Sequence, residues 1–206
     1  AANFAADVTF ADGADIITAS AGTSNFRAGV NAGNSIESGG NYNVVVGDEA
    51  GTAITTGDEN VAVGFGALNA VTTGGYNTGI GSGALDANTT ASNNTGIGFA
   101  ALGANTTGTR NTAVGALAGD ALTTGGYNVA LGAYSLTTAT TGTGNIAIGD
   151  AALNLLTTGD YNVAIGQNSL DANTTGGRNV VLGHSALTAD TVGSRAVAIG
   201  YEALAT

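Results

Sequence analysis

The sequence predicts an all-β fold, a parallel β-solenoid or β-roll built from coils of 17 residues. A five-residue run that opens with Asn and closes with Gly recurs at a fixed step of 17, and a repeat of constant length indicates a stacked architecture. Within each run, aliphatic residues alternate with small ones, which is a strand pattern. Gly is abundant (35 residues) and Pro is absent. The repeated Asn residues are Asn43, Asn60, Asn77, Asn94, Asn111, Asn128, Asn145, Asn162 and Asn179.

Each five-residue run is expected to form one strand. Its second position is Val, Thr or Ile, and its third position is Ala or Gly in eight of the ten copies. We expect the second and fourth positions to point into the core, because they carry the larger β-branched and aliphatic side chains. The small third position would then lie on the opposite face. The fourth position is always aliphatic: Val46, Val63, Ile80, Ile97, Val114, Leu131, Ile148, Ile165, Leu182 and Ile199.

Two further columns complete the coil. Leu stands four residues after the closing Gly in eight of ten coils, from Leu68 to Leu204, and is expected to be buried. Gly51 and Gly119 replace it in the other two, and Leu117 and Leu122 can compensate for Gly119. A Thr-Thr-Gly triplet begins eight residues after the closing Gly and predicts a corner. Eleven such coils would form a rod of roughly 50 Å at the spacing of neighbouring strands.

The repeat divides the chain into two parts. Residues 1–22 do not keep the register, so they are expected to form an N-terminal cap or the join to a preceding domain. Residues 23–206 form the repeat array of about eleven coils. The sequence contains no Met, which suggests a mature form or a fragment of a longer protein.

Composition argues against several classes of function. The formal net charge is −11, with four Arg and no Lys, so nucleic acids and anionic membrane surfaces are unfavourable partners. No apolar run reaches the roughly 20 residues that a membrane helix needs, so no membrane insertion is expected. Cys is absent, which removes disulfides and thiolate metal ligands.

Catalytic chemistry also finds little support in the sequence. The single histidine, His184, follows a motif Gly in a column of very varied residues, which suggests exposure. The neighbouring carboxylates Asp48 and Glu49, like Asp58 and Glu59, are more typical of solvated turns than of a glycosidase pair. Acidic residues do not recur in one column, as they would in a calcium-binding roll. We therefore expect no catalytic residue, no metal and no cofactor.

The Asn and Thr columns have structural and functional interpretations. Stacked Asn side chains can hydrogen-bond along the ladder and to turn backbone, and we favour that structural role. Regular Thr ladders could instead form an ice-binding surface. Two adjacent Thr residues would point to opposite faces, however, and the following Gly favours a corner.

One variable column resembles a recognition surface. The residue before each Asn is often Tyr or Arg, the residue types enriched at binding hot spots. The alternative is ordinary decoration of a solvated edge, and Glu59, Asn93 and Gly144 interrupt the series. The candidate receptor contacts, to a host cell-surface glycan or protein, are Tyr42, Tyr76, Arg110, Tyr127, Tyr161, Arg178 and Arg195.

The Val-Ala-Ile-Gly core of these coils, as at residues 163–166, resembles the head repeats of trimeric autotransporter adhesins. The resemblance extends from about Asn25 to Thr206, and similar repeats occur in phage tail fibres. It implies a left-handed parallel β-roll, a parallel homotrimer, and an extracellular position on a virion or a bacterial surface. The coil of 17 residues is longer than that of the adhesin heads, with the excess around Thr-Thr-Gly.

The resemblance and the residues together suggest a non-enzymatic structural or adhesive fibre segment. A core of three aliphatic side chains per coil is thin, so we expect each chain to pack against copies of itself. The sequence places the contact on the small third-position column, which includes Ala62, Ala113, Ala130 and Ala164. Two alternatives stay open: an ice-binding solenoid, and a tailspike that binds or degrades polysaccharide.

Overall fold

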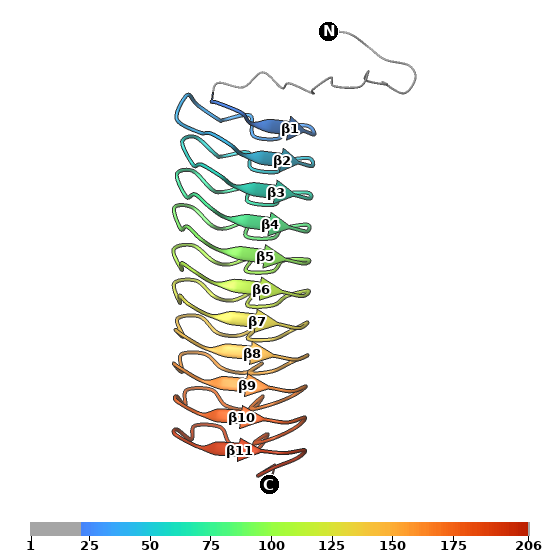
Figure 1. Ribbon diagram of the computed structural model, residues 1–206, viewed down its shortest axis with the longest axis vertical. Helices are drawn as coiled ribbons and strands as arrows, with labels where there is room; N and C mark the ends of the chain where they lie inside the picture. Colours follow the sequence, from blue (N-terminus) through green and yellow to red (C-terminus); the bar gives the residue numbers. More distant parts are fainter. Residues whose placement is uncertain (1–21, 206) are drawn as a thin grey trace, which may run out of the picture.

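The chain forms a single stack of coils joined by one parallel sheet (Figure 1). This computed structural model describes residues 22–205, so most of the predicted cap lies outside the described residues. The range contains eleven strands in sequential order and no helix, which confirms the predicted all-β parallel solenoid. The strands are β1 (Phe26–Ala28), β2 (Val44–Val46), β3 (Val61–Val63), β4 (Thr78–Ile80), β5 (Thr95–Ile97), β6 (Thr112–Val114), β7 (Val129–Leu131), β8 (Ile146–Ile148), β9 (Val163–Ile165), β10 (Val180–Leu182) and β11 (Val197–Ile199).

The strand register follows the sequence period. Each strand residue pairs with the residue 17 positions later, as Val61 does with Thr78. The first step is 18, from Phe26 to Val44, because the first coil carries one extra residue. Backbone hydrogen bonds also join neighbouring coils outside the strands: Leu68 N donates to Ala84 O at 3.0 Å, and Thr72 N to Thr89 O at 2.8 Å. The coils are therefore tied together on several sides.

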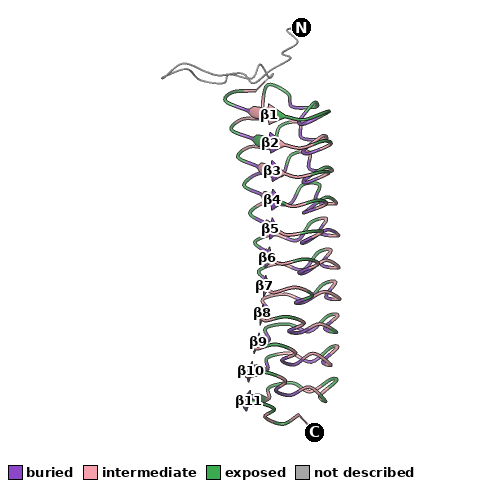
Figure 2. Cartoon of the chain, turned by 90° about the vertical axis from the view of Figure 1, so that its right-hand side faces the viewer, coloured by how far each residue is buried: buried purple, intermediate pink, exposed green. Residues whose placement is uncertain are grey.

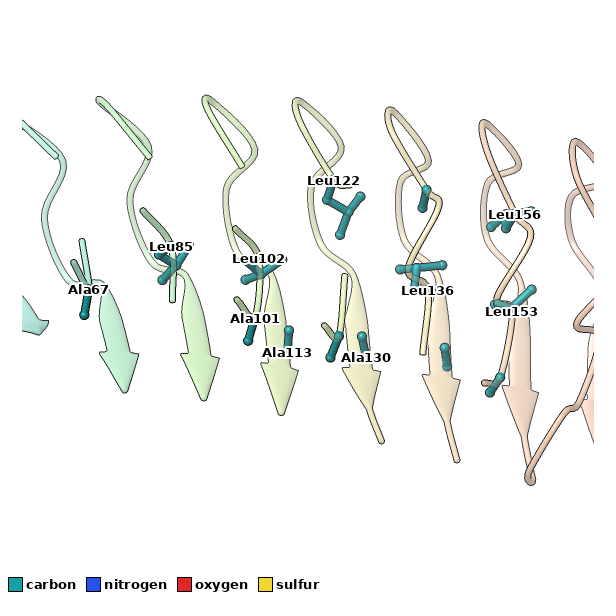
Figure 3. Close-up of a cluster of buried hydrophobic side chains, with 14 of the residues drawn as sticks. Ala67, Leu85, Ala101, Leu102, Ala113, Leu122, Ala130, Leu136, Leu153 and Leu156 are labelled. Carbon is teal, nitrogen blue, oxygen red and sulfur yellow. The ribbon is translucent and has the colours of Figure 1, made fainter. Parts of the chain in front are cut away.

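The Leu column forms the core, as predicted, except at Leu204 in the last coil, which is 60% exposed. Its members from Leu68 to Leu170 are fully buried, and Figure 3 shows several of them pointing into the space between the strand and the returning segment. Where Gly replaces Leu, another aliphatic side chain fills the space. A Cβ on Gly51 would lie 2.8 Å from Ile54 Cδ1. Leu122 is buried beside Gly119 and compensates as expected, whereas Leu117 is only half-buried.

The prediction of which strand side chains point into the core is wrong. The third position points into the core: Ala62 and Ala113 are 0% exposed and Ala130 is 1% exposed. The second and fourth positions point outward, and Ile80 and Val114 are 37% and 38% exposed. In Figure 2 the sheet is seen from its side, with buried residues alternating with partly exposed ones along each coil. The small residues therefore line the interior, not an outer contact face.

The Leu column explains this reversal. A Cβ on Gly79 would lie 3.1 Å from Leu68 Cγ, and a Cβ on Gly96 would lie 3.2 Å from Leu85 Cγ. The returning segment thus already fills the interior opposite these two strands, and Gly fits there. Elsewhere in the column the buried residue is Ala or, at Val45 and Val181, Val. We call the second- and fourth-position side chains of β1–β11 the outer sheet face.

The Asn column has the predicted structural role. The side-chain amide of Asn128 donates from Nδ2 to Asn111 Oδ1 at 3.1 Å and to Gly142 O at 2.8 Å. Its own Oδ1 accepts the backbone N–H of Asn145 at 2.9 Å. Because the Asn side chain is buried and bonded in this way in most coils, the column closes the corner against the strand.

The closing Gly of each motif is needed for close contact between coils. Gly132 has a φ of 134°, and a Cβ there would lie 2.5 Å from Gly149 O in the next coil. No other residue fits such a position without displacing backbone.

Candidate functional site

The candidate receptor residues lie on the wide corner that precedes each strand, on the left in Figure 1. We call the residue before each motif Asn from Tyr42 onward, together with Arg195 before Ala196, the corner column. Every member adopts the left-handed region, with φ between 56° and 70°. The backbone N–H of each described member from Tyr42 onward also bonds to a carbonyl of the preceding coil; for example, Tyr161 N donates to Thr143 O at 3.0 Å. The backbone is thus fixed, and the side chains project from a regular edge.

All seven candidate residues are exposed. The four tyrosines are 54–59% exposed, and Arg110, Arg178 and Arg195 are exposed as well. The structure therefore places the predicted residues together along one edge of the rod. Their role in binding a receptor stays a prediction.

The left-handed backbone of this column was not foreseen. Placing a non-Gly residue in the left-handed region costs about 1–3 kcal/mol of conformational free energy. A Tyr or Arg in the sequence therefore does not predict this backbone conformation. The residues that interrupt the series of Tyr and Arg do indicate it. Asn93 and Gly144 belong to the two residue types that adopt positive φ most readily. The hydrogen-bonded Asn that follows each member except Arg195 holds the corner in this conformation.

Two arginines of the column contact tyrosines in neighbouring coils. The Arg110 guanidinium lies over the Tyr127 ring at 5.1 Å from its centroid, and Nη1 donates to the Tyr127 hydroxyl. The Arg178 guanidinium lies 5.8 Å from the centroid of the Tyr161 ring. The Tyr161 ring in turn covers Gly144, where an added Cβ would lie 2.7 Å from the ring atom Cδ1.

The two Thr residues of each Thr-Thr-Gly triplet have different roles. The first donates its hydroxyl to the equivalent carbonyl of the next coil, as Thr123 Oγ1 does to Thr140 O at 3.0 Å. The second is exposed in every triplet. The predicted corner is confirmed, and the exposed members form one file: Thr56, Thr73, Thr90, Thr107, Thr124, Thr141, Thr158 and Thr175.

The turn after each closing Gly carries exposed, varied side chains. His184 is exposed, and its ring stacks on that of Tyr201 with 5.3 Å between centroids. Within residues 22–205 no three His, Cys, Asp or Glu side chains gather as a metal site would require. The same range has no helix long and apolar enough to cross a bilayer.

Three carboxylates on the returning segment have shifted pKa values. Partial burial raises the pKa of Asp86, Asp120 and Asp171 above the ordinary range for Asp. The negative charge of Asp86 adds to the rise at Asp120. At Asp86 and Asp171, hydrogen bonds from backbone N–H groups oppose the rise. These groups lie on the returning segment, apart from the corner column in the sequence of each coil.

Comparison with known proteins adds no relative. No protein family, curated protein or solved structure matches this chain. Function must therefore be argued from the outer sheet face and the corner column.

Proposed function

We propose that the chain is a non-enzymatic structural or adhesive segment of an extracellular fibre, either a phage tail fibre or the head of a bacterial surface adhesin. In this role it extends a receptor-binding end or carries receptor contacts along its own length. The observation that carries the proposal is the outer sheet face, a long apolar surface on a straight rod.

The outer sheet face has the composition of an interface. Across eleven strands it holds only Val, Ile, Leu, Phe, Ala and three Thr residues, with no charged side chain. Parallel sheets are normally covered on both faces by other parts of the protein, and their strands are accordingly apolar on both sides. Large continuous apolar patches on a protein surface mark contacts with other proteins or membranes. The rest of the surface carries the charge that keeps the rod soluble.

A second and third copy of the chain are the best partners for this face. The face measures about 50 Å by 10 Å, or about 500 Å² per chain, from the dimensions of strands. Three such faces amount to about 1,500 Å² in the whole trimer, or about 500 Å² for each pair of chains, which is smaller than a typical interface between two proteins. Cyclic symmetry about an axis parallel to the rod keeps every coil level with its copies. The number three and a left-handed roll follow from the resemblance to adhesin heads.

Electrostatic repulsion does not prevent this assembly. Each chain carries a net charge of −11, so three chains repel one another. At physiological salt the Debye length is about 8 Å, which limits the repulsion between charges on the outer parts of the rods. No charge lies on the outer sheet face itself, so assembly buries no unpaired ion there.

Small-angle X-ray scattering of the purified chain tests this proposal. A fibre segment should scatter as a rigid rod of about 50 Å for the repeat array, from the strand spacing. Its cross-section should fit three parallel solenoids. A compact particle, or a cross-section that fits one solenoid, would contradict the proposed role.

Ice binding remains a second candidate because of the exposed Thr file. Eight Thr side chains follow one another at the coil spacing on the Thr-Thr-Gly corner. Thermal hysteresis and ice shaping by the protein at millimolar concentration would support it, provided that both disappear when Thr124 and Thr158 are replaced by Tyr. We expect no hysteresis, because the file is only one residue wide. For a polysaccharide-degrading tailspike, no specific observation stands in support.

A further inference from the structure

The positive charge of this acidic chain is concentrated in the corner column. Three of its four arginines, Arg110, Arg178 and Arg195, belong to the column, and the chain has no Lys. Four of its six tyrosines belong to the same column. Cationic and aromatic side chains therefore share one edge of a rod whose net charge is −11.

The middle of the column has a symmetric order. Five successive coils present Arg110, Tyr127, Gly144, Tyr161 and Arg178. The two arginines flank two tyrosines, and each arginine lies over the ring next to it. Gly144 in the centre leaves room for the Tyr161 ring, which lies against it. We call these five residues the Arg-Tyr cluster.

The cluster is held ready for a ligand. Its backbone is fixed by one hydrogen bond per coil to the preceding coil, with N–O distances of 2.9–3.4 Å. Within the part of the chain that the structure describes, no ion pair engages the Arg110 or Arg178 guanidinium. Both guanidiniums therefore keep donors free for an incoming anion. Such preorganisation lowers the entropic cost of binding.

We propose that the Arg-Tyr cluster binds a linear acidic polysaccharide that lies along the rod. Guanidinium groups bind carboxylates through paired, charge-assisted hydrogen bonds. Tyr127 and Tyr161 each carry a guanidinium over the ring, and the parts of both side chains that stay exposed offer apolar contact to a sugar ring. The inference deepens the proposed function and rests on it, because the corner column is the recognition edge of the proposed fibre.

The spacing of charge favours a polysaccharide over a nucleic acid. Arg110 and Arg178 are four coils apart, which is about 19 Å at the strand spacing. A single nucleic-acid strand carries a phosphate about every 3.4 Å, and most of these would face an acidic protein without a cationic partner. A polysaccharide in which carboxylates alternate with neutral sugars places fewer charges along the same length. The two tyrosines then contact the neutral sugars between the charged ends.

Calorimetric titration with hyaluronan fragments of graded length tests the proposal. Hyaluronan alternates a carboxylated sugar with a neutral one. We expect binding once the fragment spans the cluster, with affinity that falls as salt rises. Neutral cello-oligosaccharides of the same length should bind at least tenfold more weakly. Equal binding of the neutral sugars, tighter binding of oligo-dT, or no binding by hyaluronan would overturn the proposal.

Paired variants locate the binding. Arg110→Gln with Arg178→Gln, and separately Tyr127→Asn with Tyr161→Asn, should each weaken hyaluronan binding at least tenfold. Asn is compatible with this corner because Asn93 occupies the same column with a φ of 64°. The matched control is Tyr134→Asn, an exposed tyrosine outside the corner column with a φ of 56°, whose own column holds Asn168 with a φ of 52°, and it should bind as the wild type does. An equal loss in the control would contradict the assignment.

The outcome also separates this inference from the proposed function. Rods that assemble as trimers but do not bind hyaluronan would refute the binding site and leave the fibre proposal standing. Hyaluronan binding by a chain that stays monomeric would support the binding site and refute the trimeric fibre. The Tyr→Asn double variant could lose binding because it is less stable, which a lower melting temperature would reveal. In that case the Arg→Gln double variant tests the binding site, because it leaves both tyrosine rings in place.

Discussion

Leu122 occupies the space in the core that Gly119 leaves empty. A Cβ on Gly119 would lie 3.1 Å from Leu122 Cδ1 and 3.0 Å from Leu102 Cδ2 in the preceding coil. The neighbouring coil shows the opposite combination, with Leu102 in the column of Gly119 and Asn105 in the column of Leu122. In these two coils the positions therefore share one volume, whereas Leu153 and Leu156 are both buried in their own coil.

This relationship predicts a strongly non-additive pair of substitutions. Gly119→Leu should destabilise the chain by about 1–3 kcal/mol through overpacking. Leu122→Asn should cost at least as much, because it removes a buried aliphatic side chain. The double variant reproduces the combination of Leu102 and Asn105, so it should recover part of the loss. Chemical denaturation of all four proteins gives the coupling free energy. Losses that simply add would contradict the shared volume.

The Asn ladder predicts a large effect from the loss of one amide. Asn128→Ala leaves the buried backbone N–H of Asn145 and the carbonyl of Gly142 without their partners. Each unpaired buried group costs about 1–3 kcal/mol, so the free energy of unfolding should fall by roughly 2–6 kcal/mol. Asn69→Ala is the control, because Asn69 is exposed. Its effect should stay within about 0.5 kcal/mol, as for other surface substitutions. Similar thermal melts for the two variants would refute the ladder as a stabilising element.

The raised pKa values predict how stability depends on pH. The pKa values of Asp86, Asp120 and Asp171 are higher in the folded chain, so the folded state binds more protons than the unfolded state. Their contribution to stability is therefore fully present below the unfolded pKa and is lost as pH rises through the folded pKa. Replacing all three by Asn, which occurs in the same column at residues 69 and 154, should stabilise the chain at pH 7. This gain should shrink as the pH falls to about 4, near the ordinary pKa of Asp. Melting temperatures across this range check the prediction, and a gain that does not change with pH would contradict it.

The sequence predicted the features that repeat with the coil. The Asn ladder, the buried Leu column and the Thr-Thr-Gly corner each have one residue type in a fixed column, and each physical role follows from that residue type. The period alone set the parallel register, because a stack of equal coils pairs each strand with its neighbour.

Which side chains of each strand point into the core could not be predicted in the same way. In a strand of three residues, two side chains point to one face and one to the other, and the usual assumption buries the larger pair. Here Leu68 and Leu85 cross the interior from the returning segment and leave room only for Gly79 and Gly96. The interior width depends on the path of the whole coil, which local alternation does not reveal.

The candidate site was predicted in part. The corner column was identified from its Tyr and Arg residues, and the structure places them on one exposed edge. The pairing of Arg110 with Tyr127 and of Tyr161 with Gly144 depends on side-chain directions set by the left-handed corner. Sequence spacing gives no information on those directions.

The central claim is that the outer sheet face joins three copies of the chain, and light scattering coupled to size-exclusion chromatography tests it most directly. The wild type should have three times the mass of one chain. Val129→Lys with Leu131→Lys, on the outer sheet face, should give a monomer with a wild-type circular dichroism spectrum, whereas Ala130→Glu, pointing into the core, should unfold the chain. A stable wild-type monomer or dimer, or a trimer that survives both lysines, would contradict the account.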